Sequence, residues 1–148
     1  MDHFLPATIK SDNWFIRGQL ISKQIRSWMI THEALDVAIE EPIYSWGRRN
    51  PKGFAKQNIL MGLILGTLSN DSKIWLVNPK SMKLYFTRDG NADKEAIIAR
   101  ASRHYNLSAT HIKRKPNREA IADAIGIAYV CYRYRLNKGN VKGVTLLG

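Results

Sequence analysis

Apolar residues recur at helical spacing in several stretches of the chain. Between residues 13 and 31 they follow Ser11, Asp12 and Asn13, three residue types that commonly cap helices, so a helix is expected over 13–31. The same spacing predicts further helices over 54–69, Ser81–Phe86, Asp93 to about His104, and 118–135. The helix over 54–69 is so apolar that we expect it to be covered on most sides.

Two short apolar runs, each stopped near a proline, predict buried strands. Leu35–Glu40 ends before Pro42, and Lys73–Val77 ends before Asn78-Pro79. Residues 2–10, broken by Pro6, predict an edge strand or an extended arm. The order of strand, helix, strand, helix and helix predicts an α/β layer fold with helices on both faces of a sheet.

The remaining segments are polar or basic connections. Residues 43–53 and 108–117 predict basic loops, Arg88-Asp89-Gly90 predicts a turn, and the Gly- and Lys-containing tail 136–148 is expected to be flexible. A chain of 148 residues can bury one sizeable core. We therefore interpret residues 1–135 as a single domain, followed by a basic flexible tail over 136–148.

The charge balance indicates a polyanionic partner. Lys and Arg number 23 against 12 acids, a net charge of +11 at pH 7. The simpler alternative is that this charge only keeps the protein soluble. Cys131, the only cysteine, lies in an apolar run, which favours a buried structural thiol in a reducing compartment. No apolar run is long enough to span a bilayer and the first residues do not resemble a secretory signal, so we expect a cytoplasmic protein without a membrane partner.

Glu40 lies at the carboxyl end of a predicted strand, where ligands commonly bind in α/β sheets. Because side chains alternate along a strand, Glu40 and Glu41 point to opposite faces, and only one of them can line a given site. The alternative is that both acids mark the exit of the strand into solvent.

Asp123 lies inside an apolar helix, where an unpaired carboxylate is costly. Glu119, four residues earlier, shares its helix face, and a cation between the two would relieve their repulsion. The alternative is a solvent-facing pair offset by Arg118. Acidic residues held at buried element ends in a basic protein suggest a divalent metal, and with it chemistry on nucleic acid.

Two lysines are the basic counterparts of these acids. Lys94 follows Asp93, which we interpret as a helix N-cap, and Lys83 projects from the short amphipathic helix. A lysine near a scissile phosphate can stabilise developing negative charge. The alternative is that both are solvated surface lysines, as isolated lysines usually are. The histidines lack metal-ligand spacing, and there is no Gly-rich phosphate loop and no zinc pattern.

The ordered set of segments resembles the RuvC-like Holliday junction resolvases of the RNase H-like superfamily. The matching segments occur in the order of that family over residues 35–130: Val37–Pro42, Gly62–Gly66, Asn78–Lys83, Thr87–Lys94 and Ala122–Ala128. The resemblance implies an RNase H-like mixed sheet with helices on both faces, here lacking the first catalytic strand. It further implies a homodimer that cuts four-way DNA junctions in recombination and repair, with Mg²⁺, or else Mn²⁺, held by carboxylates.

Site residues follow from the same resemblance. Glu40 would be the strand carboxylate and Asp123 the helix carboxylate, with Glu119 as a further metal ligand. Lys83 and Lys94 would complete the catalytic set. The predicted DNA-binding residues are Arg48, Arg49, Lys52, Lys83, Lys94, Lys113, Arg114 and Lys115, to which a purely binding protein would add Lys138 and Lys142.

The chain departs from the family at two places. Three residues before the helix Asp the family often has an acid or His, but here that position is Ala120 and the nearest substitute is Glu119. The family also begins with a strand that carries a metal-binding Asp, and nothing before Glu40 matches it. Three explanations are open, and we favour the first, that the chain is truncated. The second is that it is a degenerate relative that binds DNA without cutting it. The third is that another acid, such as Asp36 or Asp2, replaces the missing Asp.

Three functions are therefore compared. The first is a metal-dependent endonuclease selective for branched DNA. The second is a non-catalytic protein that binds branched DNA through the same basic surface. The third is another RNase H-like activity, such as cutting RNA–DNA hybrids.

Overall fold

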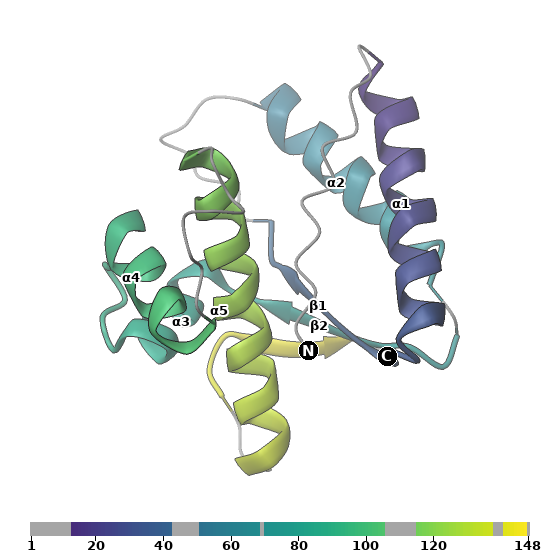
Figure 1. Ribbon diagram of the computed structural model, residues 1–148. Coiled ribbons are helices and arrows are strands. Elements are labelled where there is room, and N and C mark those ends of the chain that lie inside the picture. The colour runs from purple at the N-terminus through teal and green to yellow at the C-terminus, as the bar shows by residue number, and fades with distance from the viewer. Residues whose placement is uncertain (1–12, 43–50, 69, 106–114, 138–140, 148) are drawn as a thin grey trace. The chain divides into compact units, whose positions relative to one another are not determined.

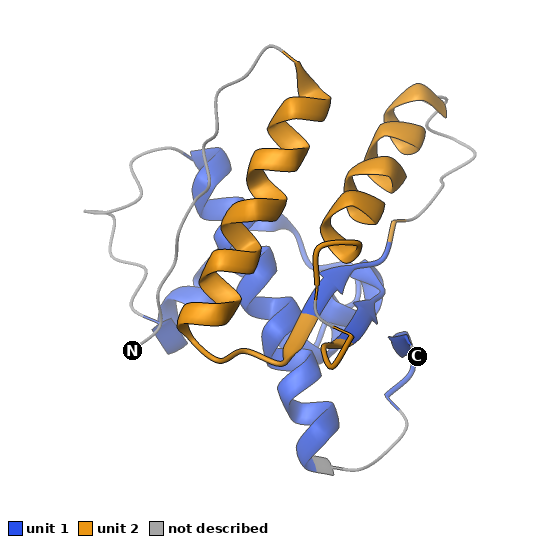
Figure 2. Cartoon of the chain, turned by 90° about the vertical axis from the view of Figure 1, so that its right-hand side faces the viewer, with its two compact units in different colours: residues 1–6, 38–41, 74–148 blue, residues 7–37, 42–73 orange. Residues whose placement is uncertain are grey.

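The computed structural model describes residues 13–42, 51–68, 70–105, 115–137 and 141–147. The element order is α1 (Trp14–Thr31), β1 (Asp36–Glu40), α2 (Pro51–Leu65), β2 (Lys73–Val77), α3 (Pro79–Thr87), α4 (Lys94–Tyr105), α5 (Lys115–Asn137) and β3 (Val144–Leu147) (Figure 1). Contacts divide the chain into two compact units (Figure 2). Among the described residues, unit 1 contains 38–41 and those from 74 onward, and unit 2 contains those of 13–37 and 42–73.

Within the described residues, three strands form a mixed sheet in the order β1-β2-β3. Lys73 N donates to Leu35 O at 2.8 Å, and Glu41 N donates to Val77 O at 2.9 Å, so β1 and β2 run parallel. β3 pairs antiparallel with β2, from Ile74 opposite Leu147 to Val77 opposite Val144. A parallel pair needs a long crossover, and here the segment between β1 and β2 includes α2.

The core of unit 1 lies where α3, α4 and α5 pack against one another. Ile97 and Val77 are fully buried, and Phe86 and Val130 are 1% exposed. Tyr134 of α5 contacts Trp75 of β2 edge to face, with ring centroids 5.1 Å apart, so α5 packs on the sheet. Cys131 is buried, as the sequence predicts.

Side-chain caps fix the starts of three helices. Asn13 Oδ1 accepts hydrogen bonds from Phe15 N and Ile16 N, Asn78 Oδ1 caps α3 in the same way, and Asp93 Oδ1 accepts from Ala96 N. Such caps satisfy backbone donors that the first helical turn leaves free, each contributing about 1 kcal/mol. The helix starts predicted at 13 and 93 are confirmed.

Arg88 ends α3 in an unusual backbone conformation. Its φ of 68° lies in the left-handed region, where glycine is the common residue after a helix. For a residue with a Cβ this conformation costs roughly 1–2 kcal/mol. The turn predicted at 88–90 is present, with Arg88 rather than Gly90 at its left-handed position.

Unit 2 consists mainly of α1 and α2, which pack together at Gly18. A Cβ at Gly18 would overlap Leu60 and lie 3.3 Å from Leu63 Cδ1, so the helices approach closely because glycine is there. The prediction that this second helix is covered on most sides is wrong: none of its residues is buried, and Ile59 is 47% exposed. Its apolar residues are only half-covered, and α1 is the helix on which it packs.

Several helices and strands begin or end at other residues than the sequence predicts. Val144–Leu147 form β3 instead of a flexible tail, because they pair with the edge of β2. α2 begins at Pro51 and α5 at Lys115, inside stretches predicted to be loops, because a proline is well tolerated in the first helical turn. α3 spans Pro79–Thr87, longer than predicted. Predictions for 2–10 and for most of 43–53 and 108–117 lie outside the described residues.

In the part of the chain that the structure describes, no helix has both the length and the apolar character needed to cross a bilayer.

Candidate functional site

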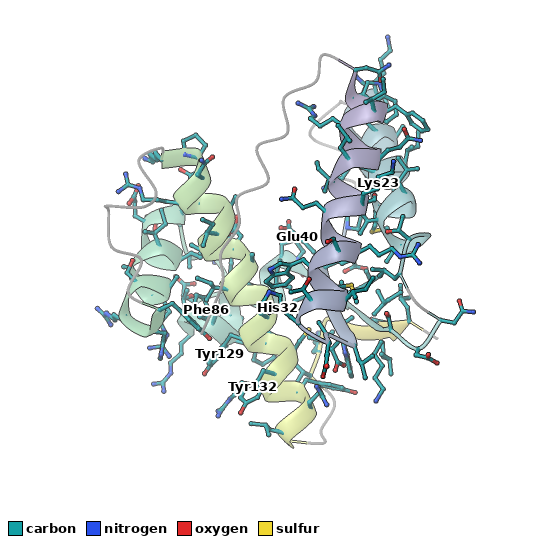
Figure 3. The ribbon with its side chains drawn as sticks, turned by 45° about the vertical axis from the view of Figure 1, so that its right-hand side comes forward. Lys23, His32, Glu40, Phe86, Tyr129 and Tyr132 are labelled. Atoms are coloured by element: carbon teal, nitrogen blue, oxygen red, sulfur yellow. The ribbon has the colours of Figure 1, made fainter. Side chains whose placement is uncertain are left out.

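The end of β1 sends its two acids to different partners. Asn78 Nδ2 donates to Glu41 Oε2 at 3.2 Å, so Glu41 belongs to a hydrogen-bonded junction beside α3. Glu40, labelled in Figure 3, instead interacts electrostatically with Asp123, Lys94 and Lys83. The alternation expected at this strand end therefore assigns Glu40 to the site and Glu41 to structure.

The environment of Glu40 raises the pKa of its carboxyl above 4.5. Desolvation by the surrounding residues is the largest cause, although the side chain retains an exposed surface. The negative charge of Asp123 adds to the increase, while Lys94 and Lys83 oppose it. Two carboxylates that disfavour each other's charge form a place where a cation is stabilised.

Lys94 and Asp123 form a direct ion pair between α4 and α5. The Lys94 ammonium donates to Asp123 Oδ2, and the Asp123 side chain is 19% exposed while that of Lys94 is 49% exposed. Lys94 is the first residue of α4, directly after the capping Asp93. The sequence indicates only that Lys94 lies at the start of a helix. The structure shows that it is also the counter-ion of Asp123.

Lys83 of α3 completes the group and is partly buried. All four residues predicted to be catalytic, Glu40, Lys83, Lys94 and Asp123, thus belong to unit 1, and the other three all interact electrostatically with Glu40. They come from one strand and three helices that are far apart in sequence. Their chemical roles stay predictions.

The structure does not bring Glu119 together with Glu40 and Asp123 in one metal-binding group, and its role as a ligand stays a prediction. The described residues contain no group of three or more His, Cys, Asp or Glu side chains that could hold a metal. Glu119 acts on Lys115, whose pKa is raised first by its hydrogen bond to Glu95 and then by the charges of Glu95 and Glu119. Lys115 Nζ lies 3.0 Å from Glu95 Oε1. Glu119 is therefore part of a basic–acidic cluster at the start of α5.

Two carboxylates still fit one kind of metal site. Mg²⁺ commonly binds to one or two protein carboxylates and completes its coordination with water and substrate phosphate oxygens. Glu40 and Asp123 provide such a pair, and the Lys94 ammonium already marks the place as favourable for positive charge. The residues fit a magnesium ion shared with a phosphate, and they do not form a closed protein cage.

The predicted DNA-binding residues are distributed over the chain. Lys83 and Lys94 lie at the site, Lys115 is exposed and paired with Glu95, and Lys52 is exposed on α2 in unit 2. Lys142, added for a purely binding protein, is exposed ahead of β3. Arg48, Arg49, Lys113, Arg114 and Lys138 lie outside the described residues.

Asn78 is a positioning residue that is absent from the site predicted from the sequence. Its side chain caps α3 and binds Glu41, and its backbone N donates to Gly143 O at 2.7 Å. It therefore joins the ends of β1 and β2, the start of α3 and the approach to β3. The Asn-Pro pair before a helix was the available signal, since asparagine is a strong N-cap and proline is favoured at the first helical position.

Comparison with solved structures finds this fold in RuvC of Thermus thermophilus. The two match with a TM-score of 0.68 and 17% sequence identity over 94% of this chain and 79% of that chain. No family model and no curated protein sequence matches. The chain therefore has a RuvC-like, RNase H-like α/β fold, which confirms the predicted fold class. At this level of identity the likeness concerns the fold alone.

Proposed function

We propose that this protein is a metal-dependent endonuclease that cuts four-way DNA junctions in recombination and repair. The observation that carries the proposal is the arrangement around Glu40, where a second carboxylate, Asp123, and two lysines act on the same carboxyl group. Charges of both signs gathered at a strand end are suited to a metal and a phosphate together. The RuvC-like fold and the net charge of +11 support a nucleic-acid substrate.

Each residue has a role in this proposal. Glu40 and Asp123 hold Mg²⁺ or Mn²⁺, which when bound supplies Lewis-acid stabilisation of charge on the phosphate. Lys83 and Lys94 place positive charge where negative charge develops during cleavage. Lys94 also holds Asp123 in place before the substrate arrives. A junction has two equivalent strands to cut, so the active form is proposed to be a homodimer.

The test is cleavage by the full chain of a labelled four-way junction, a linear duplex of the same sequence and an RNA–DNA hybrid. Each substrate is incubated with Mg²⁺, with Mn²⁺ and with EDTA. We expect symmetric nicks in the junction that require a metal, and little cleavage of the other two substrates. Equal cutting of duplex and junction would contradict junction selectivity, and preferential cutting of the hybrid would support the third function instead.

A non-catalytic protein that binds branched DNA is the second candidate. The ion pair of Lys94 with Asp123 favours it, because the ammonium already neutralises one of the two carboxylates. Among the described residues, the lack of a group of three or more His, Cys, Asp or Glu side chains that could hold a metal favours it too. This candidate predicts tight, strongly salt-dependent binding of the junction without metal-dependent nicks.

A further inference from the structure

A second basic surface lies in unit 1, around a cavity of about 230 Å³. Its walls carry three guanidinium groups and two phenol rings: Arg88, Arg100, Arg133, Tyr85 and Tyr129. The side chains come from the end of α3, from α4 and from the second half of α5. Neither the proposed catalytic site nor the DNA-binding residues predicted from the sequence include any of them.

The cavity and the Glu40 site share no residue. Tyr129 follows Asp123 by six residues on α5, and at about 100° per residue the two side chains point about 120° apart. Tyr85 follows Lys83 by two residues on α3, which separates them by about 160°. A ligand in the cavity therefore contacts a different face of these helices from a ligand at Glu40 and Asp123.

None of the three arginines forms an ion pair with an acidic side chain in the described part of the chain. Arg100 Nε donates to Phe86 O at 3.2 Å, which orients the guanidinium and leaves its two terminal nitrogens available. Asp89, next to Arg88, accepts from Asn91 N in its own turn. Guanidinium groups that share one cavity repel each other, so the cavity is best filled by an anion.

The backbone at Arg88 points to the same conclusion. Its φ of 68° places an arginine where glycine would avoid the strain. Nothing in its backbone role as the residue after α3 requires a long cationic side chain. A strained residue that lines a cavity is a candidate for binding, because the strain persists where the side chain has another use.

The aromatic wall is held rigidly at one side. The Tyr129 ring packs against Phe86, with centroids 5.4 Å apart, and against His104 at 6.2 Å; Figure 3 labels Phe86 and Tyr129. Tyr85 is 41% exposed, so its ring is open to a ligand. Fixed aromatic faces beside arginines are the arrangement on which unpaired bases stack in single-strand binding proteins.

We propose that this cavity binds one nucleotide, with its phosphate on Arg88, Arg100 and Arg133 and its base stacked on a tyrosine ring. The cavity is smaller than the roughly 300–1,000 Å³ of pockets that enclose whole drug-sized ligands, so it takes one nucleotide unit and not a longer segment. The nucleotide comes from an unpaired nucleic-acid strand or is a free mononucleotide. The inference does not depend on nuclease activity.

The test measures binding by the full chain in EDTA, by calorimetry, of deoxyadenosine monophosphate, deoxyadenosine and a short single-stranded oligonucleotide. We expect Arg88→Gly and Arg133→Gln each to weaken binding of a phosphate-bearing ligand roughly tenfold. Arg103→Gln removes the same charge from α4 outside the cavity and is expected to leave affinity nearly unchanged. Deoxyadenosine is expected to bind far more weakly than its monophosphate.

Arg88→Gly also separates binding from folding. Glycine suits the left-handed position, so the melting temperature is expected to be unchanged or higher while affinity falls. If Arg88→Gly and Arg133→Gln weaken binding of the mononucleotide, the cavity is a site for free nucleotides. If they weaken binding of the oligonucleotide alone, the cavity is a site for an unpaired strand. Equal affinities for Arg88→Gly, Arg133→Gln and Arg103→Gln with every ligand would overturn the proposal. Because the assay contains EDTA and measures binding alone, a failed nuclease proposal leaves its result intact.

Discussion

The Lys94 ammonium donates to the Asp123 carboxylate although the two residues are 29 positions apart in the sequence. The pair joins the first turn of α4 to the middle of α5, beside the carboxyl end of β1. It holds Asp123 in place and at the same time puts a cation where the proposed metal ion would bind. If the proposal holds, the ammonium and the metal compete for Asp123, and experiments can address this competition first.

Removing the Lys94 charge should strengthen metal binding. Lys94→Gln frees Asp123 and lowers the positive potential near Glu40, so we expect the affinity for Mn²⁺ to rise roughly 2- to 5-fold. Titration followed by electron paramagnetic resonance measures this directly. Lys80→Gln, an exposed lysine on α3, is the matched control. Unchanged or weaker Mn²⁺ binding by Lys94→Gln would show that Asp123 is not a ligand.

Glu40 should make stability depend on pH in metal-free protein. Its pKa in the folded state is raised above 4.5, so below 4.5 both states are protonated and Glu40 contributes nothing. Above the raised pKa both states are ionised, and the desolvated charge destabilises the folded state. Glu40→Gln should therefore increase the free energy of unfolding at neutral pH, and the gain should fade as the pH drops toward 4.5.

Urea unfolding in EDTA measures this effect, with Glu33→Gln in unit 2 as a control for net charge. A gain for Glu40→Gln of the same size at neutral and at acid pH would contradict the environment described for Glu40. Added Mg²⁺ should stabilise the wild type more than Glu40→Gln, since the metal would offset the ionised carboxylate.

Gly143→Ala should destabilise unit 1. Gly143 has a φ of 82°, and a Cβ there would overlap Ser81 Oγ and lie 2.8 Å from Ser81 Cβ. Backbone strain and the clash together should lower the free energy of unfolding by roughly 2–4 kcal/mol. Gly62→Ala on α2 is the matched control, since nothing lies within 4 Å of its new methyl group. That control should be stabilised by up to about 1 kcal/mol, and an equal response of the two variants would contradict the turn geometry.

Asn78→Asp should separate the two functions of the Asn78 side chain. Aspartate can still accept from Lys80 N and cap α3, but it cannot donate to Glu41 and places a like charge beside it. We expect a loss of stability at neutral pH that is recovered on acidification. Asn78→Ala removes the helix cap as well. Its free energy of unfolding should therefore be lower by about 1 kcal/mol or more, also at low pH. Identical pH profiles for the two variants would contradict the contact with Glu41.

Local signals in the sequence predicted much of the fold. Asn13 and Asp93 were identifiable because a capping side chain acts within three residues of its own position. β1 and β2 were identifiable because apolar runs bounded by prolines are typical of buried strands. The starts of α2 and α5 were missed because Pro51 and Pro116 look like loop residues, although proline suits a first helical turn.

The features that the sequence could not predict depend on contacts between residues that are far apart in the chain. β3 forms because Val144–Leu147 pair with the edge of β2. The local sequence of a short Gly- and Lys-containing tail does not predict this pairing. The approach of Glu40 to Asp123 was suggested only by resemblance to a family, because neither residue carries a local signal of its partner. Glu119 was predicted as a ligand from its spacing to Asp123, and the structure shows that its charge also acts on Lys115.

Junction cleavage by Glu40→Gln and Asp123→Asn tests the central claim most directly. Cleavage is measured in Mg²⁺ on a labelled four-way junction, and junction binding is measured separately in EDTA as a control for folding. We predict that both variants bind the junction nearly as the wild type does and that neither produces nicks. Metal-dependent cleavage that survives in both variants would show that the site around Glu40 and Asp123 does not perform the reaction.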